Sequence, residues 1–202
     1  MSRVFQHLNN PDMNVVFISA FTSPEILMKL QDLQSVPSEQ ETLGFNLKRH
    51  QDLKKDLVEK RVGIVELDSG WIYEDDTGKE RTQEEQSFMA PNIEKGYAIS
   101  LCKKYHQQCI MMKDDSGLYL INPDGTTGFQ IVGKGHGVTL SFKPEDIKKG
   151  FSALIRANHN QRGVKFSFVQ DRDQAKKPMS IPEMLIGLEF GRIPKYKTKK
   201  RQ

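Results

Sequence analysis

The feature that most constrains the fold is the stretch from Lys95 to Ile121, in which a helical pattern passes directly into two strand patterns. Apolar side chains recur at steps of four from Ile93 to Tyr105, which is typical of a helix with one buried face. Short apolar runs follow at 109–112 and 118–121, on either side of an Asp-Asp-Ser-Gly turn. The stretch therefore predicts a helix followed by a hairpin, and the rest of the sheet is expected to extend this unit.

The N-terminal part predicts one strand and two helices. Residues 14–20 form a short β-branched and aromatic run, which is typical of a strand buried on both faces. Ser23 and Pro24 stand at the N-cap and first position of a helix that should reach about Gln34. A second helix is expected over 39–60, where the leucines form an imperfect apolar stripe.

The remaining segments predict short strands, turns and one more helix. Strands are expected at 61–67, 70–73 and 86–90, with the acidic stretch 74–85 as a solvated loop. Strands at 129–132 and 138–142 are expected to pair around a glycine-rich turn, and a helix is expected from Pro144 to about Asn158. The alternating residues 164–169 predict a last strand, and 181–190 form a last apolar piece. We therefore predict an α+β (mixed α/β) domain over residues 1–190, with a single mixed sheet with hairpins flanked by about four helices.

Composition limits the class of protein. A chain of 202 residues with 37% hydrophobic and 28% charged residues is ordinary for one globular domain. No apolar run approaches the roughly 18 to 20 residues that span a bilayer, and the N-terminus lacks a long apolar signal core, so a cytoplasmic location is expected. Cys102 and Cys109 are expected to be buried free thiols. The five histidines are dispersed, and neither a metal nor a cofactor is predicted.

Positive charge is concentrated at the C-terminus. Residues 191–202 contain six Lys or Arg and no acid, so the other 190 residues carry −2 of the chain's net +4. Such a segment binds phosphate backbones through counterion release, and its tyrosine could stack on an unpaired base. An acidic protein surface would suit it equally, and a solubilising disordered terminus is the alternative. The predicted nucleic-acid-binding residues are Arg192, Lys195, Tyr196, Lys197, Lys199, Lys200 and Arg201.

Four short stretches carry weak motifs whose order and spacing are informative. They are Ile18-Ser19-Ala20-Phe21, Asn46 with Leu53 and Leu57, Glu84-Glu85-Gln86-Ser87-Phe88, and His106-Gln107-Gln108-Cys109-Ile110. Their order resembles a family of bacterial and phage proteins catalogued only as a domain of unknown function. The resemblance covers about residues 14–121, and Thr22-Ser23-Pro24 stands where the family has an Asn-Pro motif. It implies a fold and an origin in phage or bacteria, but no reaction.

The polar residues within these motifs are the candidate ligand site. If they converge at strand ends, they would bind a small polar ligand, because open sheets place ligands there. The alternative is that they make local backbone bonds or face solvent. The candidate ligand-binding residues are Ser19, Asn46, Arg49, Glu85 and Gln108. If the protein is an enzyme, its candidate catalytic residues are Glu85, Arg49, His50 and His106.

These observations favour a non-enzymatic accessory binding protein of phage or bacterial type, acting in the host cytoplasm if phage-encoded. It would engage a protein partner, nucleic acid or both, and a small-molecule ligand is compatible with the candidate site. Two alternatives stay open: a phosphoesterase or nuclease-like enzyme acting on nucleotides or nucleic acid, and a virion or assembly component.

Overall fold

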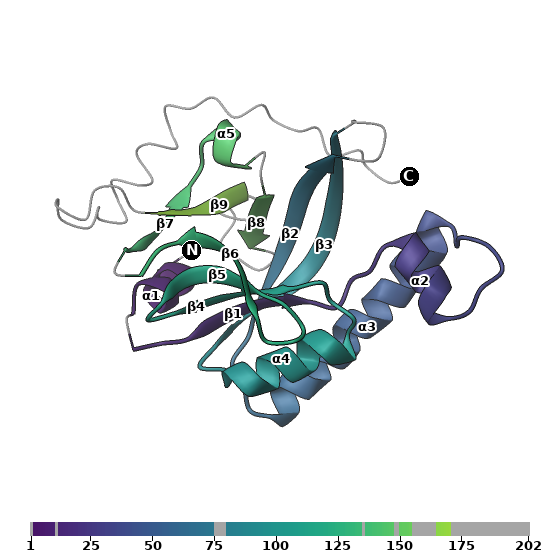
Figure 1. Cartoon of the computed structure of the whole chain (residues 1–202), viewed down its shortest axis with the longest axis horizontal. Coiled ribbons are helices and arrows are strands. Elements are labelled where there is room, and N and C mark those ends of the chain that lie inside the picture. The colour runs from purple at the N-terminus through teal and green to yellow at the C-terminus, as the bar shows by residue number, and fades with distance from the viewer. Residues whose placement is uncertain are drawn as a thin grey trace, which may run out of the picture.

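Strands from almost the whole described chain form one antiparallel sheet that curls into a nearly closed barrel (Figure 1). The computed structural model describes residues 2–10, 12–74, 80–134, 136–147, 150–154 and 165–170. The strand order across the sheet is β6-β5-β4-β1-β3-β2-β8-β9-β7. The strands are β1 (Val15–Ser19), β2 (Val65–Glu74), β3 (Glu80–Pro91), β4 (Ile110–Asp114), β5 (Gly117–Ile121), β6 (Thr127–Val132), β7 (Val138–Ser141), β8 (Gly150–Leu154) and β9 (Lys165–Gln170). The helices are α1 (Ser2–Asn9), α2 (Pro24–Leu30), α3 (Glu39–Glu59), α4 (Lys95–Lys104) and α5 (Pro144–Ile147).

The two faces of the central strand β1 belong to two different buried clusters. Its residue Phe17 pairs with Met89 on one side and Met111 on the other. Because successive strand residues point to opposite faces, these three side chains face the barrel interior, while Val16 and Ile18 face outward. All five residues of β1 are buried, so both faces of this strand are covered.

The barrel interior is packed with apolar side chains at the end that α1 closes. Val4 and Leu8 of α1 join the buried cluster there, and the ammonium of Lys113 donates to the carbonyls of Asn10 and Met13 just after the helix. The edge strands β6 and β7 meet in this cluster through Val132, Val138 and Leu140 of the barrel wall. Strand members of the cluster are Val15, Phe17, Leu67, Met89, Leu118, Val132, Val138, Leu140 and Phe166.

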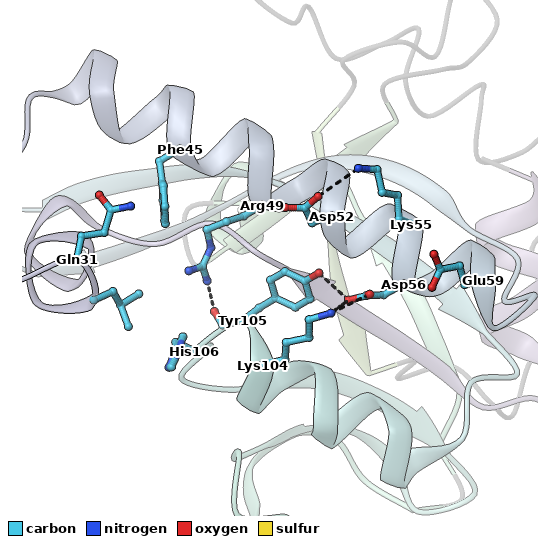
Figure 2. A pocket seen from close by; sticks show the side chains of 11 residues that line it. Gln31, Phe45, Arg49, Asp52, Lys55, Asp56, Glu59, Lys104, Tyr105 and His106 are labelled. Carbon is cyan, nitrogen blue, oxygen red and sulfur yellow. Dashed lines mark hydrogen bonds and ion pairs between the residues drawn. The ribbon is translucent and has the colours of Figure 1, made fainter.

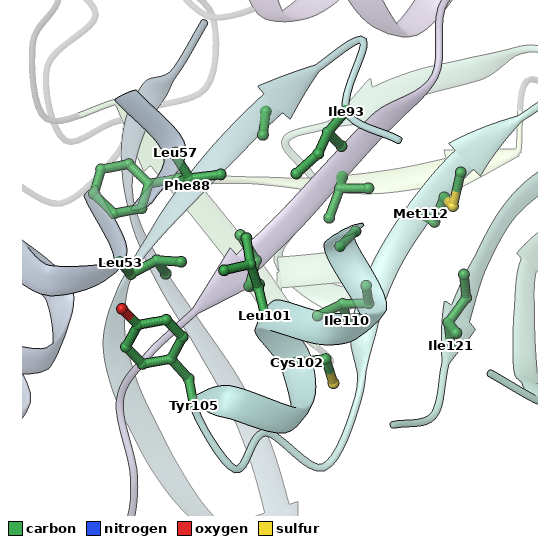
Figure 3. Close-up of a cluster of buried hydrophobic side chains, with 14 of the residues drawn as sticks. Leu53, Leu57, Phe88, Ile93, Leu101, Cys102, Tyr105, Ile110, Met112 and Ile121 are labelled. Carbon is green, nitrogen blue, oxygen red and sulfur yellow. The ribbon is translucent and has the colours of Figure 1, made fainter. Parts of the chain in front are cut away.

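Helices α3 and α4 cover the outer face of the sheet. Figure 3 shows Leu53 and Leu57 of α3 and Leu101 of α4 packing toward Phe88 and Ile110 on the strands. A capping box starts α3, because Ser38 accepts from the Glu41 amide and the Glu41 carboxylate accepts from the Ser38 amide. The α3–α4 pair thus turns one sheet face into a second core, separate from the barrel interior.

The predicted fold class, an α+β domain with one mixed sheet flanked by about four helices, is wrong. The sheet is entirely antiparallel and closes nearly into a barrel, with few helices. One cause lies at 144–158, where Ile147, Phe151 and Leu154 have helical spacing but the ladder to β2 makes 150–154 a strand. Tertiary pairing outweighs such a short periodic signal.

Strand pairing also differs from the prediction in two places. Within the acidic stretch, residues 74 and 80–85 are strand, because β2 and β3 pair in a long antiparallel ladder that runs from Val65–Met89 to Glu74–Glu80. Strands β6 and β7 exist, but β6 pairs with β5 and β7 pairs with β9. For 74–85 the residue pattern predicted a loop where the β2–β3 ladder forms, and for β6 and β7 it gave the strands without their partners.

Several local predictions are confirmed. Strand β1, helix α3, the α4 helix and the β4–β5 hairpin lie where the sequence placed them. Ser23 caps α2 with Pro24 at its start, although α2 ends earlier than expected, at Leu30. Among the residues that the structure describes, no helix has both the length and the apolar character needed to cross a bilayer. The apolar piece 181–190 and the basic tail 191–202 lie outside the described residues.

We predict that truncating Leu57 of α3 to alanine lowers the free energy of unfolding by about 2–5 kcal/mol, because the fully buried end of the leucine side chain is lost. Leu43→Ala on the same helix is the matched control, since Leu43 is 51% exposed. Its effect should stay within about 0.5 kcal/mol. Urea unfolding monitored by circular dichroism measures both, and equal effects of the two changes would contradict the packing described for α3.

Candidate functional site

The end of the barrel away from α1 holds a cavity of about 490 Å³. Every strand except β7 contributes to its wall, together with the α4–β4 connection and α5. Its apolar lining residues include Phe17, Met111, Leu120, Phe129, Ile131 and Phe168. Its polar wall is formed by Ser19, Ser69, Glu85, Ser87, Gln107, Cys109, Asp146, Ser152 and Ser167. The volume and the mixed lining fall within the range that is typical of small-molecule pockets.

A chain of three serine hydroxyls crosses one wall of this cavity. The Oγ of Ser69 lies 2.7 Å from the Oγ of Ser87 and 3.2 Å from the Oγ of Ser152. Strand register brings them together, because Ser69 of β2 is opposite Ser152 of β8, and Ser87 is on the neighbouring strand β3. Ser87 and Ser152 are only 4% and 5% exposed, so these hydroxyls are directed inward.

Two carboxylates and a thiol complete the polar wall. Glu85 of β3 is directly opposite Ser69 in the ladder, and both residues line the cavity. Asp146 of α5 accepts from the hydroxyl of Ser141. Burial, and to a lesser degree the charge of Glu85, raise the pKa of the Cys109 thiol, so this thiol is neutral at physiological pH.

A second concavity, the α3–α4 groove, lies on the helical side of the molecule (Figure 2). It has a volume of about 510 Å³ and is lined by Leu30, Gln31, Phe45, Arg49, Asp52, Lys55, Asp56, Glu59, Lys104, Tyr105 and His106. Figure 2 shows the Arg49 guanidinium bonded to the Tyr105 carbonyl, and Lys104 and Tyr105 both directed at Asp56. These polar groups are engaged in holding the two helices together.

The electrostatics of the groove fit this structural role. Although burial alone would raise it, the pKa of Asp56 is lowered by hydrogen bonds from the Lys104 ammonium, at 2.7 Å, and from the Tyr105 hydroxyl, at 2.6 Å. Burial lowers the pKa of the Arg49 guanidinium, which stays charged at any physiological pH. The groove is therefore a bonded helix junction with both signs of charge.

Three side chains satisfy the backbone where the chain leaves β1. Arg49 Nε donates to the Ala20 carbonyl at 2.7 Å, and Gln107 Nε2 donates to the Phe21 carbonyl at 2.9 Å. Asn46 accepts from the Thr22 amide and donates to the Thr22 carbonyl, each at 2.9 Å. Buried backbone groups need such partners, so these residues anchor the β1 exit.

The ligand residues predicted from the sequence lie in different parts of the structure. Ser19 and Glu85 both line the barrel cavity. Asn46 and Arg49 hold the β1 exit from the helical side, and Gln108 is exposed.

The predicted catalytic group is divided too. Glu85 lines the cavity, whereas Arg49 and His106 line the α3–α4 groove. His50 is buried and stacks on the ring of Phe88, with ring centroids 4.2 Å apart. In the part of the chain that is described, no three His, Cys, Asp or Glu side chains are placed to share a metal ion.

Sequence reasoning missed the hydroxyl chain and Gln107. Ser69, Ser87 and Ser152 are far apart in the sequence, and only the barrel register joins them. Ser69 is followed by Gly70 and Ser152 by Ala153, and neither strand segment carries a recognisable motif. The available signals were two weak motif matches. Glu-Glu-Gln-Ser-Phe contains Ser87 and His-Gln-Gln-Cys-Ile contains Gln107, but Glu85 and Gln108 were the residues selected from them.

A comparison with known protein families finds no model that matches this chain, and no curated protein matches it either. The resemblance to the bacterial and phage family of unknown function stays a prediction.

We predict that His50 makes folding stability fall on acidification. Burial lowers the pKa of His50 from its usual 6.5, with Glu66 opposing this shift and Lys54 adding to it. Below pH 6.5 the His50 imidazole is therefore more fully protonated in the unfolded chain than in the native state. The free energy of unfolding then falls as the pH drops further. His50→Phe keeps an aromatic ring against Phe88 and should flatten the dependence between about pH 8 and pH 5.

The control for this measurement is His106→Gln, which changes an exposed histidine. Urea midpoints across the pH range should keep the wild-type slope in this variant. An unchanged slope in His50→Phe would show that the buried imidazole is not the group responsible.

Proposed function

We propose that the chain is a non-enzymatic binding protein that holds a small, largely apolar molecule inside its barrel. The observation that carries the proposal is the cavity of about 490 Å³, with an apolar wall on one side and hydroxyls on the other. Pockets of about 300–1,000 Å³ with an apolar lining and a few polar groups are typical of small-molecule sites.

The barrel supports binding because its two ends differ. The α1 end is filled by packed side chains, which gives the cavity a closed floor. The opposite end keeps half-buried side chains such as Met111 and Phe168 around open space. An apolar ligand would gain about 25 cal/mol for each Å² of apolar surface removed from water there. The serine hydroxyls would fix the orientation of its one polar group.

The arrangement favours binding over acid–base chemistry. Of the predicted catalytic residues, Glu85 lines the cavity and Arg49 and His106 line the α3–α4 groove. His50 is buried against the ring of Phe88. The three central serines bond one another. A serine nucleophile is usually activated by a hydrogen-bonded base, and the hydrogen bonds described for Ser69 run to two other hydroxyls.

The wider expectations from the sequence stay part of this proposal. A cytoplasmic accessory role of phage or bacterial type rests on the resemblance and on composition. Contact of residues 191–202 with nucleic acid or an acidic protein rests on their charge alone, because they lie outside the described residues. Barrel binding and tail binding are compatible, since they use different parts of the chain.

We predict saturable binding of the neutral fluorescent probe N-phenyl-1-naphthylamine to the folded protein. Leu120→Trp should weaken it at least about tenfold, a loss of about 1.4 kcal/mol. Leu120 is paired with Met111 across β4 and β5 and lines the cavity, so a larger ring there takes up ligand space. Fluorescence titration at fixed protein concentration measures the affinity.

Val58→Trp is the matched control, because it places the same ring on the outer surface of α3, at a residue that is 56% exposed. Its affinity for the probe should equal that of the wild type. Non-saturable binding to the wild type, or equal affinity in Leu120→Trp and wild type, would refute the barrel as the binding site.

A further inference from the structure

The described polar lining of the cavity combines two carboxylates with a row of serine hydroxyls. We propose that, given the barrel-binding function above, the ligand is an amphiphilic amine whose ammonium group sits between Glu85 and the Ser69–Ser87 hydroxyls. The inference rests on that proposed function and adds the charge of the ligand.

The charged side chains among the described lining residues have one sign. Glu85 and Asp146 are the only ionised side chains among the described residues that line the cavity, and no Lys, Arg or His from that part of the chain joins them. Both are half-buried, so their charges are less screened than those on an open surface. The negative charge of Glu85 reaches into the cavity, since it acts on the thiol of Cys109 on the opposite side of β1.

The hydrogen-bonding capacity of the wall matches an ammonium group. A primary ammonium carries three N–H donors and no acceptor, so it needs three oxygen acceptors. The three bonded hydroxyls have six lone pairs, and their two mutual bonds use two of them. The carboxylate of Glu85, opposite Ser69 in the ladder, adds a charged acceptor next to these oxygens. Charge-assisted bonds of this kind are stronger than neutral ones.

A carboxylate ligand fits the same wall poorly. The three serine hydroxyls have three protons, and two of these protons form the bonds between the hydroxyls. One O–H donor of this group is therefore left for a ligand. The carboxylate would also be brought close to Glu85 and Asp146, and like charges repel in a partly desolvated site. An alcohol lies between the two cases, because it both donates and accepts without charge.

The test is displacement of bound N-phenyl-1-naphthylamine from the full chain by decylamine, decanol and decanoate, each kept below its micelle concentration near neutral pH. These ligands share one apolar chain and differ in head group. In the wild type, decylamine should displace the probe at a concentration at least about tenfold lower than decanoate, with decanol between them.

Two single substitutions separate the cavity charge from general surface charge. Glu85→Gln should reduce the preference for decylamine over decanoate, measured as the ratio of their displacing concentrations, by about tenfold. The reason is that this change removes the charged acceptor. Glu84→Gln removes the neighbouring exposed carboxylate, which pairs with Lys165 at 3.4 Å outside the cavity, and should leave the ratio unchanged. Circular dichroism and the decanol affinity report whether each variant keeps its folded cavity.

The outcomes distinguish the two proposals. If decanol displaces the probe but decylamine shows no preference over decanoate, barrel binding stands and the amine inference is wrong. A preference that persists in Glu85→Gln, or is lost equally in Glu84→Gln, also overturns the inference. If the wild type does not bind the probe at all, the proposed function itself fails.

Discussion

The structure depends on the burial of strand β1 on both faces. Its inward residues Val15 and Phe17 belong to the barrel interior, and its outward residues Val16 and Ile18 belong to the core beneath α3 and α4. A strand with two apolar faces can only be stable where both are covered, so the barrel and the helical layer require each other. The polar network of Asn46, Arg49 and Gln107 at the β1 exit then fixes where the helical side meets the sheet.

The residues that line the barrel interior change in character along its length. Near α1 its strands contribute large apolar residues that fill the space, as expected for a packed small barrel. Toward the other end the inward positions of β1, β2, β3 and β8 become serine or glutamate, namely Ser19, Ser69, Glu85 and Ser152. Small polar side chains leave volume unfilled and bring hydrogen-bonding groups into it, which is why the cavity forms there. The described residues thus give one cavity both an apolar wall and a polar wall.

Local sequence patterns predicted the elements better than their assembly. The apolar run of β1, the cap at Ser23 and the β4–β5 hairpin are encoded by neighbouring residues, and all three are confirmed. The barrel depends on pairings between distant strands, such as β7 with β9 and β2 with β8, which no local pattern specifies. For the same reason the sequence could suggest Ser19 and Glu85 as ligand residues, yet it gave no means to find their partners Ser69 and Ser152.

The central claim is that ligand enters the barrel interior and not the helix-covered core. Met111 and Met112 are adjacent on β4 and face these two compartments, Met111 the cavity and Met112 the core under α4. Methyl NMR spectra of ¹³C-labelled methionine, recorded while decanol is added, test the claim directly. The account predicts a saturable shift of the Met111 methyl with the Met112 methyl nearly unmoved. A shift of Met112 alone, or no saturable shift of Met111, would contradict it.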